Sequence, residues 1–123
     1  MKVINIFAGP GCGKSTTATG VFHELKKLDK NVEYISEYAK DLIYESRFEH
    51  LNDYLYILAE QHHRLLRLNK KVDIVVCDGS FLLGLIHYKQ TSIYNKILFK
   101  ALVLDIFNKY ENINYFLKRK HLI

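Results

Sequence analysis

The sequence has no tryptophan, one proline and only two cysteines among its 123 residues. Cys12 and Cys77 are too few and too far apart for the disulfide framework that stabilises small secreted domains. Because proline and glycine are scarce, no linker rich in these residues is visible, and the chain contains no internal repeat. We therefore expect residues 1–123 to form one domain.

Long hydrophobic runs are also absent, since no apolar segment reaches the ~18 residues of a membrane-spanning helix. The first residues, MKVINIFAGP, lead directly into an apolar strand and a turn, and they lack the features of a secretory signal. These observations predict a cytoplasmic protein with no membrane partner.

The composition is that of a folded protein, with 49% hydrophobic and 25% charged residues, which excludes collagen-like and disordered chains. The net charge of +5 comes from residues 89–123, which carry seven basic and two acidic side chains, whereas residues 1–88 are balanced. A solvated helix face and a frayed end account for this excess, and contact with a phosphate backbone is the alternative.

Short apolar segments alternate with segments of helical periodicity, which predicts the α/β class. Strands are predicted at 3–7, 32–35, 72–77 and 113–117. Such alternation favours a parallel sheet with helices on both faces and right-handed crossovers. We expect about four strands in the order second, third, first and fourth, that is 2-3-1-4.

Apolar residues at helical spacing predict the buried faces of five intervening helices. These residues are Ala18, Val21, Phe22, Leu25 and Leu28; Ala39, Leu42 and Ile43; Leu51, Tyr54, Leu55, Leu58, His62, Leu65 and Leu66; Leu82, Leu85 and Ile86; and Ile93, Ile97, Ala101 and Leu104. Asn52 is expected to cap the third helix and Ser92 to lie near the start of the fifth.

The segment between the first strand and the first helix has the pattern of a Walker A loop, which binds nucleotide phosphates. Glycines let successive backbone N–H groups turn inward around an anion, while the lysine reaches the β- and γ-phosphates and the serine binds Mg²⁺. The pattern departs from the strict motif only at Ala8, where a small residue suffices. The predicted ATP-binding residues are Gly9, Pro10, Gly11, Cys12, Gly13, Lys14, Ser15 and Thr16.

Carboxylates follow two of the predicted strands. Asp78 follows the third strand, where a Walker B aspartate would support the metal, although it could merely cap a turn. Glu37 follows the second strand and could accept a proton from an acceptor hydroxyl or hold the ligand, or it could simply open the next helix. Asp41, one turn further on, is a weaker candidate for contact with the acceptor.

Gln61 and Arg64 lie three residues apart on the longest helical segment, with Arg67 displaced around the helix. Glutamine can hydrogen-bond a base edge and arginine can bind a phosphate with two hydrogen bonds, so both are candidates for acceptor binding. An exposed polar face opposite the leucines explains them equally well.

Other chemistries find no support in the sequence. The histidines and cysteines show no paired spacing of metal ligands, and Glu60-x-x-His63 is only half of a di-iron motif. The G-x-S-x-G motif of many serine hydrolases is absent, and the scattered aromatic residues do not indicate an RNA-stacking platform.

The Walker A segment, Ser36-Glu37-Tyr38-Ala39-Lys40-Asp41, Gln61-x-x-Arg64 and the strand ending in Asp78 stand in a familiar order. The chain resembles small phage P-loop ATPase/kinase domains and the ribosylnicotinamide kinase half of NadR-type proteins and, more distantly, nucleoside and nucleotide kinases. The resemblance implies a three-layer P-loop fold, host cytoplasm if the chain is phage-encoded, and transfer of the ATP γ-phosphoryl group to a nucleoside- or nucleotide-like acceptor. It also implies roles for single residues: Lys14 and Ser15 would hold ATP and Mg²⁺, Asp78 would support the metal, and Glu37 and Gln61 would face the acceptor.

The chain departs from these kinases after the fourth strand, where they continue into an arginine-bearing lid and a fifth strand. Only Lys118–Ile123 remain here, which predicts ATP binding but slow transfer unless a partner, an oligomer contact or a longer C-terminus supplies an arginine. The alternatives are a regulatory or truncated protein that binds or slowly hydrolyses ATP, and a polynucleotide 5′-kinase that uses the basic C-terminus.

Overall fold

The computed structural model describes residues 1–8, 12–80, 82 and 95–118 of the chain. Its elements in chain order are β1 (Lys2–Ala8), α1 (Lys14–Lys27), β2 (Val32–Ile35), α2 (Tyr38–Tyr44), the 3₁₀ turn η1 (Phe48–His50), α3 (Tyr54–Leu66), β3 (Ile74–Asp78), α5 (Lys96–Phe107) and β4 (Glu111–Leu117). The helix predicted around Leu82, Leu85 and Ile86 falls mostly on residues outside this description.

The strands form one parallel sheet in the order β2-β3-β1-β4, as the sequence predicted. Parallel pairing brings the carboxyl ends of all strands to one edge, because no strand reverses direction. In the register of this sheet, Ile6 of β1 lies opposite Asp78 at the end of β3. The α/β class and the strand order are therefore confirmed.

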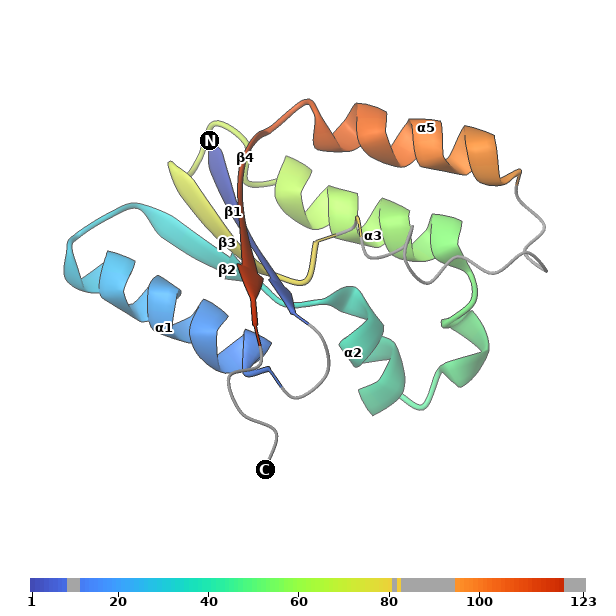
Figure 1. Cartoon of the computed structure of the whole chain (residues 1–123), viewed down its shortest axis with the longest axis horizontal. Helices are drawn as coiled ribbons and strands as arrows, with labels where there is room; N and C mark the ends of the chain where they lie inside the picture. Colours follow the sequence, from blue (N-terminus) through green and yellow to red (C-terminus); the bar gives the residue numbers. More distant parts are fainter. Residues whose placement is uncertain (9–11, 81, 83–94, 119–123) are drawn as a thin grey trace.

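The helices cover the two faces of the sheet unequally (Figure 1). Helix α1 lies on one face, where Ala18 packs against Ile6, Val32 and Val76. Helices α3 and α5 lie on the other face. That side buries a larger core, made of Val3, Ile35, Tyr54, Leu58, Leu65, Val75, Cys77, Phe99 and Val103. Strand β3 contributes side chains to both clusters, as its unbroken apolar sequence predicted.

The predicted helix faces were only partly right. In α3 the buried side chains are Tyr54, Leu58, Gln61 and Leu65, a narrower stripe than predicted. Leu55 and Leu66, which were assigned to that stripe, are 42% and 52% exposed, because they flank the face that meets the sheet. A wide run of leucines therefore indicated the helix but not the limits of its buried face.

Apolar assignments in three other helices need the same correction. In α2, Leu42 is buried as predicted, but Ile43, which the prediction placed on the same face, is 48% exposed. Helix α5 packs through Phe99 and Val103. The residues that the prediction placed on its face, Ile97, Ala101 and Leu104, are exposed, and Ile93 lies outside the described residues. In α1, Leu28 lies at the C-terminal cap and is 67% exposed, since it is past the last turn that contacts the sheet.

The caps also differ from those predicted. Asp53, not Asn52, caps α3 by accepting a hydrogen bond from the backbone N–H of Tyr56. Asn95 caps α5 by accepting from the N–H groups of Ile97 and Leu98. Ser92, which was expected near this start, lies outside the described residues.

None of the helices in the described ranges is long and apolar enough to cross a lipid bilayer.

Adjacent leucines in α3 give a direct test of this packing. Leu65 is 2% exposed and Leu66 is 52% exposed. We expect Leu65→Ala to lower the free energy of unfolding by about 2–5 kcal/mol, since it leaves a cavity in the core. Leu66→Ala should cost less than about 1 kcal/mol. Urea denaturation of both variants measures the difference, and equal losses would contradict the orientation of α3.

Candidate functional site

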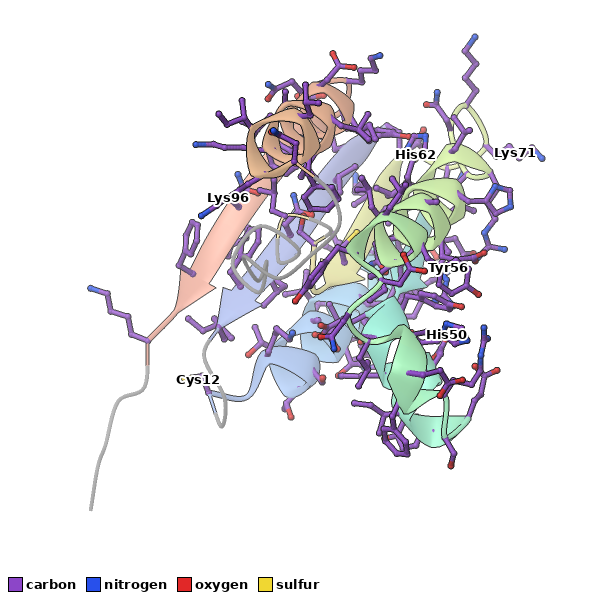
Figure 2. All side chains as sticks on the ribbon, turned by 90° about the vertical axis from the view of Figure 1, so that its right-hand side faces the viewer. Cys12, His50, Tyr56, His62, Lys71 and Lys96 are labelled. Atoms are coloured by element: carbon purple, nitrogen blue, oxygen red, sulfur yellow. The ribbon has the colours of Figure 1, made fainter. Side chains whose placement is uncertain are left out.

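The carboxyl edge of the sheet brings together the segments that the sequence singled out. Helix α1 begins at Lys14, just after β1, while Glu37 follows β2 and Asp78 ends β3. Cys12 lies at the bend that leads into α1 (Figure 2). Gly9, Pro10 and Gly11 lie outside the described residues, so the expected phosphate loop is seen here only from Cys12 onward.

The start of α1 has the features of an anion-binding helix terminus. Gly13 has φ +75°, a left-handed conformation that favours glycine. Gly13 is the N-cap residue of α1 and provides no side-chain cap to its N–H groups, and the described first turn carries no acidic residue. The first N–H groups of α1 and the positive end of its dipole therefore face the sheet edge without a competing carboxylate on the same turn. Thr16, in the same turn, is exposed.

Four of the predicted site residues meet at this edge. The Lys14 ammonium donates a hydrogen bond to Glu37 Oε2 at 3.0 Å and lies 3.8 Å from Asp78 Oδ1. The Ser15 hydroxyl donates to Asp78 Oδ2 at 2.6 Å. Residues from α1, from the start of α2 and from the end of β3 thus form one polar cluster, which we call the Lys14–Asp78 cluster.

The carboxylate of Asp78 is the buried centre of this cluster, since its side chain is 1% exposed. Besides Ser15, its Oδ2 accepts hydrogen bonds from the Tyr34 hydroxyl and the Lys40 ammonium, each at 3.0 Å. Burial alone would raise the pKa of Asp78, but these hydrogen bonds from Ser15, Lys40 and Tyr34 hold it below its ordinary value. The carboxylate is therefore charged at neutral pH.

The residues of the cluster fit Mg²⁺ on chemical grounds. Mg²⁺ prefers oxygen ligands, and the pair at hand is a serine hydroxyl and a carboxylate. Among the described residues, Asp78 Oδ1 accepts no hydrogen bond although it is buried, which leaves an oxygen with coordinating capacity. The same part of the chain contains no group of three or more His, Cys, Asp or Glu that could hold a metal by itself. The phosphates of a nucleotide would have to supply further oxygens.

Gln61, predicted to face an acceptor, has another role in this structure. Its side chain is buried between α2 and the end of β3. Its Oε1 accepts from the backbone N–H of Tyr38 at 2.9 Å, and its Nε2 donates to the carbonyl of Gly79 at 3.1 Å. Gln61 therefore ties the start of α2 to the residue after Asp78, and its contact with an acceptor stays a prediction.

Arg64 and Asp41, two further candidates for acceptor binding, form an ion pair with each other. The Arg64 guanidinium also lies over the ring of Tyr38, 4.8 Å from its centre. Both groups are partly exposed, at 23% and 38%, so solvent reaches them beside the Lys14–Asp78 cluster rather than within it.

Next to Arg64, Tyr38 of α2 contacts Tyr56 of α3. The hydroxyls of Tyr38 and Tyr56 are 2.7 Å apart, and Arg47 donates to Tyr56 at 3.2 Å. Burial and the hydrogen bond with Tyr56 raise the pKa of Tyr38 to about 12. His50 and Tyr56 lie together on η1 and α3, with ring centres 5.8 Å apart (Figure 2). This arrangement joins α2, η1 and α3.

Three residues of the site were missed from the sequence. Lys40 stands three positions after Glu37 and therefore on the same side of α2, a spacing that could have identified it. Tyr34 lies on β2, and Gly79 follows Asp78 with φ +90°. The spacing makes Lys40 a candidate, but the contacts of all three residues are made between elements, which no local pattern records.

Comparison of the chain with protein-family models, with curated proteins and with solved structures finds no match.

Substitution of Gly79 tests how closely the backbone after Asp78 approaches Glu37. A Cβ at this position would lie 3.0 Å from Glu37 Cβ, and the backbone conformation is left-handed. Gly79→Ala should lower the free energy of unfolding by more than about 1 kcal/mol. Gly20 in α1 has open space around it, so Gly20→Ala should stabilise the protein by about 0.5–1 kcal/mol. Chemical denaturation of both variants checks these opposite signs, and a neutral Gly79→Ala would contradict the close approach to Glu37.

Proposed function

We propose that the chain is a P-loop phosphotransferase that binds ATP with Mg²⁺ at the carboxyl edge of its sheet. It transfers the γ-phosphoryl group to a nucleoside- or nucleotide-like acceptor. The observation that carries this proposal is the 2.6 Å hydrogen bond between Ser15 and Asp78. It joins the serine of a Walker A pattern to an aspartate in the Walker B position, and the two sequence patterns were found independently of each other.

In this proposal Lys14 binds the β- and γ-phosphate oxygens from the first turn of α1. Ser15 and Asp78 hold the metal, which supplies charge neutralisation at the phosphates when it is bound. The open first turn after Gly13 adds backbone N–H donors for the phosphates. Phosphoryl transfer depends mainly on such positioning and positive charge, and the described residues offer both.

Glu37 is proposed to accept the proton of the acceptor hydroxyl. Its side chain is 25% exposed, so one side reaches solvent while Oε2 is held by Lys14. The close approach of Gly79 limits where the carboxylate can move. A carboxylate fixed beside the phosphate-binding lysine is placed for proton transfer at the attacking oxygen.

A second candidate function is ATP binding without transfer to a small acceptor. It is favoured by the internal contacts of Gln61 and Arg64, which use the groups expected to recognise an acceptor. A screen of nucleosides and nucleotides with radiolabelled ATP separates the two. A labelled product supports transfer, whereas release of inorganic phosphate alone supports the second function.

The role of Lys14 predicts the behaviour of one variant. Lys14→Met should lower ATP affinity at least about tenfold, because a charged hydrogen bond of about 1.5–3 kcal/mol is lost. Lys27 lies at the other end of α1 and is 59% exposed, so Lys27→Met is the matched control and should bind ATP like the wild type. Isothermal titration calorimetry measures both. Unchanged affinity in Lys14→Met would place nucleotide binding elsewhere.

The role of Glu37 predicts a different result. Glu37→Gln should slow phosphoryl transfer by about 10²–10⁴-fold and leave ATP affinity nearly unchanged, because the amide cannot take up a proton at neutral pH. Glu33→Gln changes an exposed carboxylate on β2, the strand that precedes Glu37, and should transfer at the wild-type rate. Single-turnover transfer to the acceptor found in the screen is the measurement. A wild-type rate in Glu37→Gln would leave this residue as a structural partner of Lys14.

A further inference from the structure

Lys40 lies between Ser15 and Asp78, the two residues proposed to hold the metal. Its ammonium donates to Ser15 Oγ at 2.6 Å and to Asp78 Oδ2 at 3.0 Å. These are the same two atoms that hydrogen-bond each other at 2.6 Å. Neither the Walker A pattern nor the Walker B position includes this lysine, which comes from the first turn of α2.

A buried carboxylate needs a counter-charge, and Lys40 supplies the closest one. The Asp78 side chain is 1% exposed, and the other ammonium near it, that of Lys14, is 3.8 Å from Oδ1 and hydrogen-bonded to Glu37. Lysine is suited to this role because its ammonium is a compact charge on a flexible stem. The side chain is 37% exposed, so it has solvent on one side into which it can move.

The ammonium and a metal ion cannot share this position. Mg²⁺ binds its oxygen ligands at about 2.0–2.1 Å, so an ion bound to Ser15 Oγ and Asp78 Oδ2 would overlap the Lys40 ammonium, which lies 2.6 Å and 3.0 Å from them. Two cations within a few ångströms of each other would also repel strongly in a buried site. Binding of Mg²⁺ to Ser15 Oγ and Asp78 therefore requires Lys40 to leave, because Lys40 donates to that same hydroxyl oxygen.

We propose that Lys40 is a built-in placeholder for the magnesium ion, which neutralises Asp78 in the free protein and competes with the metal. This inference rests on the proposed function, since it takes Ser15 and Asp78 as the metal ligands. If about 90–99% of the free protein holds Lys40 in place, the apparent affinity for the metal alone is reduced about 10- to 100-fold. Metal then binds well only together with the phosphates of a nucleotide, which supply additional ligands.

If Lys40 instead helped to bind the metal–nucleotide complex, its removal would change metal affinity in the opposite direction. A lysine that contacts the phosphates of a bound metal–nucleotide complex strengthens binding, so its removal would weaken metal affinity. A placeholder weakens metal binding, so its removal strengthens it. The direction of the change therefore distinguishes the two roles.

The test uses Mn²⁺, whose free ion is counted by electron paramagnetic resonance, in titrations without nucleotide and with ADP. Lys40→Met should bind Mn²⁺ roughly tenfold more tightly than the wild type. Lys40→Arg keeps the charge and should stay near the wild type. Lys30→Met removes the same charge at an exposed position outside the site and is the matched control, with unchanged Mn²⁺ affinity.

A second measurement needs no variant at the metal site and covers the case in which Lys40→Met does not fold. The ¹⁵N signal of a hydrogen-bonded lysine ammonium differs from that of a solvated one. In wild-type protein the Lys40 signal should shift to the solvated position when Mg²⁺ and ADP are added. A Lys40 signal that stays unchanged while Mg²⁺·ADP is bound would overturn the placeholder role.

The outcomes separate this inference from the proposed function. Equal or weaker Mn²⁺ binding by Lys40→Met, including no detectable binding to either protein, would overturn the placeholder. Absence of nucleotide binding at every Mg²⁺ concentration would instead contradict the proposed function. In that case tighter Mn²⁺ binding by nucleotide-free Lys40→Met would still support the competition between Lys40 and a metal.

Discussion

The burial of one carboxylate, that of Asp78, organises the functional edge of this protein. A charge taken out of water at the end of a central strand is strongly destabilising unless hydrogen bonds and an opposite charge surround it. The chain meets this requirement with groups from three other elements: Ser15 from α1, Tyr34 from β2 and Lys40 from α2. The same need that fixes the position of Asp78 therefore draws α1 and α2 to the edge of the sheet.

A second layer of contacts sets the position of α2, and with it two residues of the cluster. Gln61 spans from the N–H of Tyr38 to the carbonyl of Gly79, so it links α2 and the end of β3 through α3. Because Glu37 directly precedes α2 and Lys40 lies in its first turn, both depend on this link. The packing of α3 in the core therefore helps to fix the positions of Glu37 and Lys40, because Gln61 of α3 hydrogen-bonds to the backbone on either side of the cluster.

Much of this architecture could be predicted from the sequence, because it is encoded locally. The strand order follows from alternating elements, and Lys14, Ser15 and Asp78 stand at strand and helix boundaries whose meeting point a parallel sheet determines. What could not be predicted depends on tertiary packing. The exposed positions of Leu55 and Leu66, the internal bridge made by Gln61 and the reach of Lys40 are all decided by how α2 and α3 lie against the sheet.

The charges of the cluster explain why the placeholder and the phosphate-binding lysine belong to one arrangement. Two ammonium groups, those of Lys14 and Lys40, face two carboxylates, those of Glu37 and Asp78. The free protein therefore balances these charges internally, with each carboxylate paired. Under the proposed function, a metal at Asp78 releases Lys40 and phosphates at Lys14 release Glu37. Lys14 thus exchanges its carboxylate for the phosphates, whereas Lys40 exchanges its carboxylate for solvent. The exchange frees Glu37 to accept a proton only when the phosphates are present, which couples its role as a base to occupancy of the site.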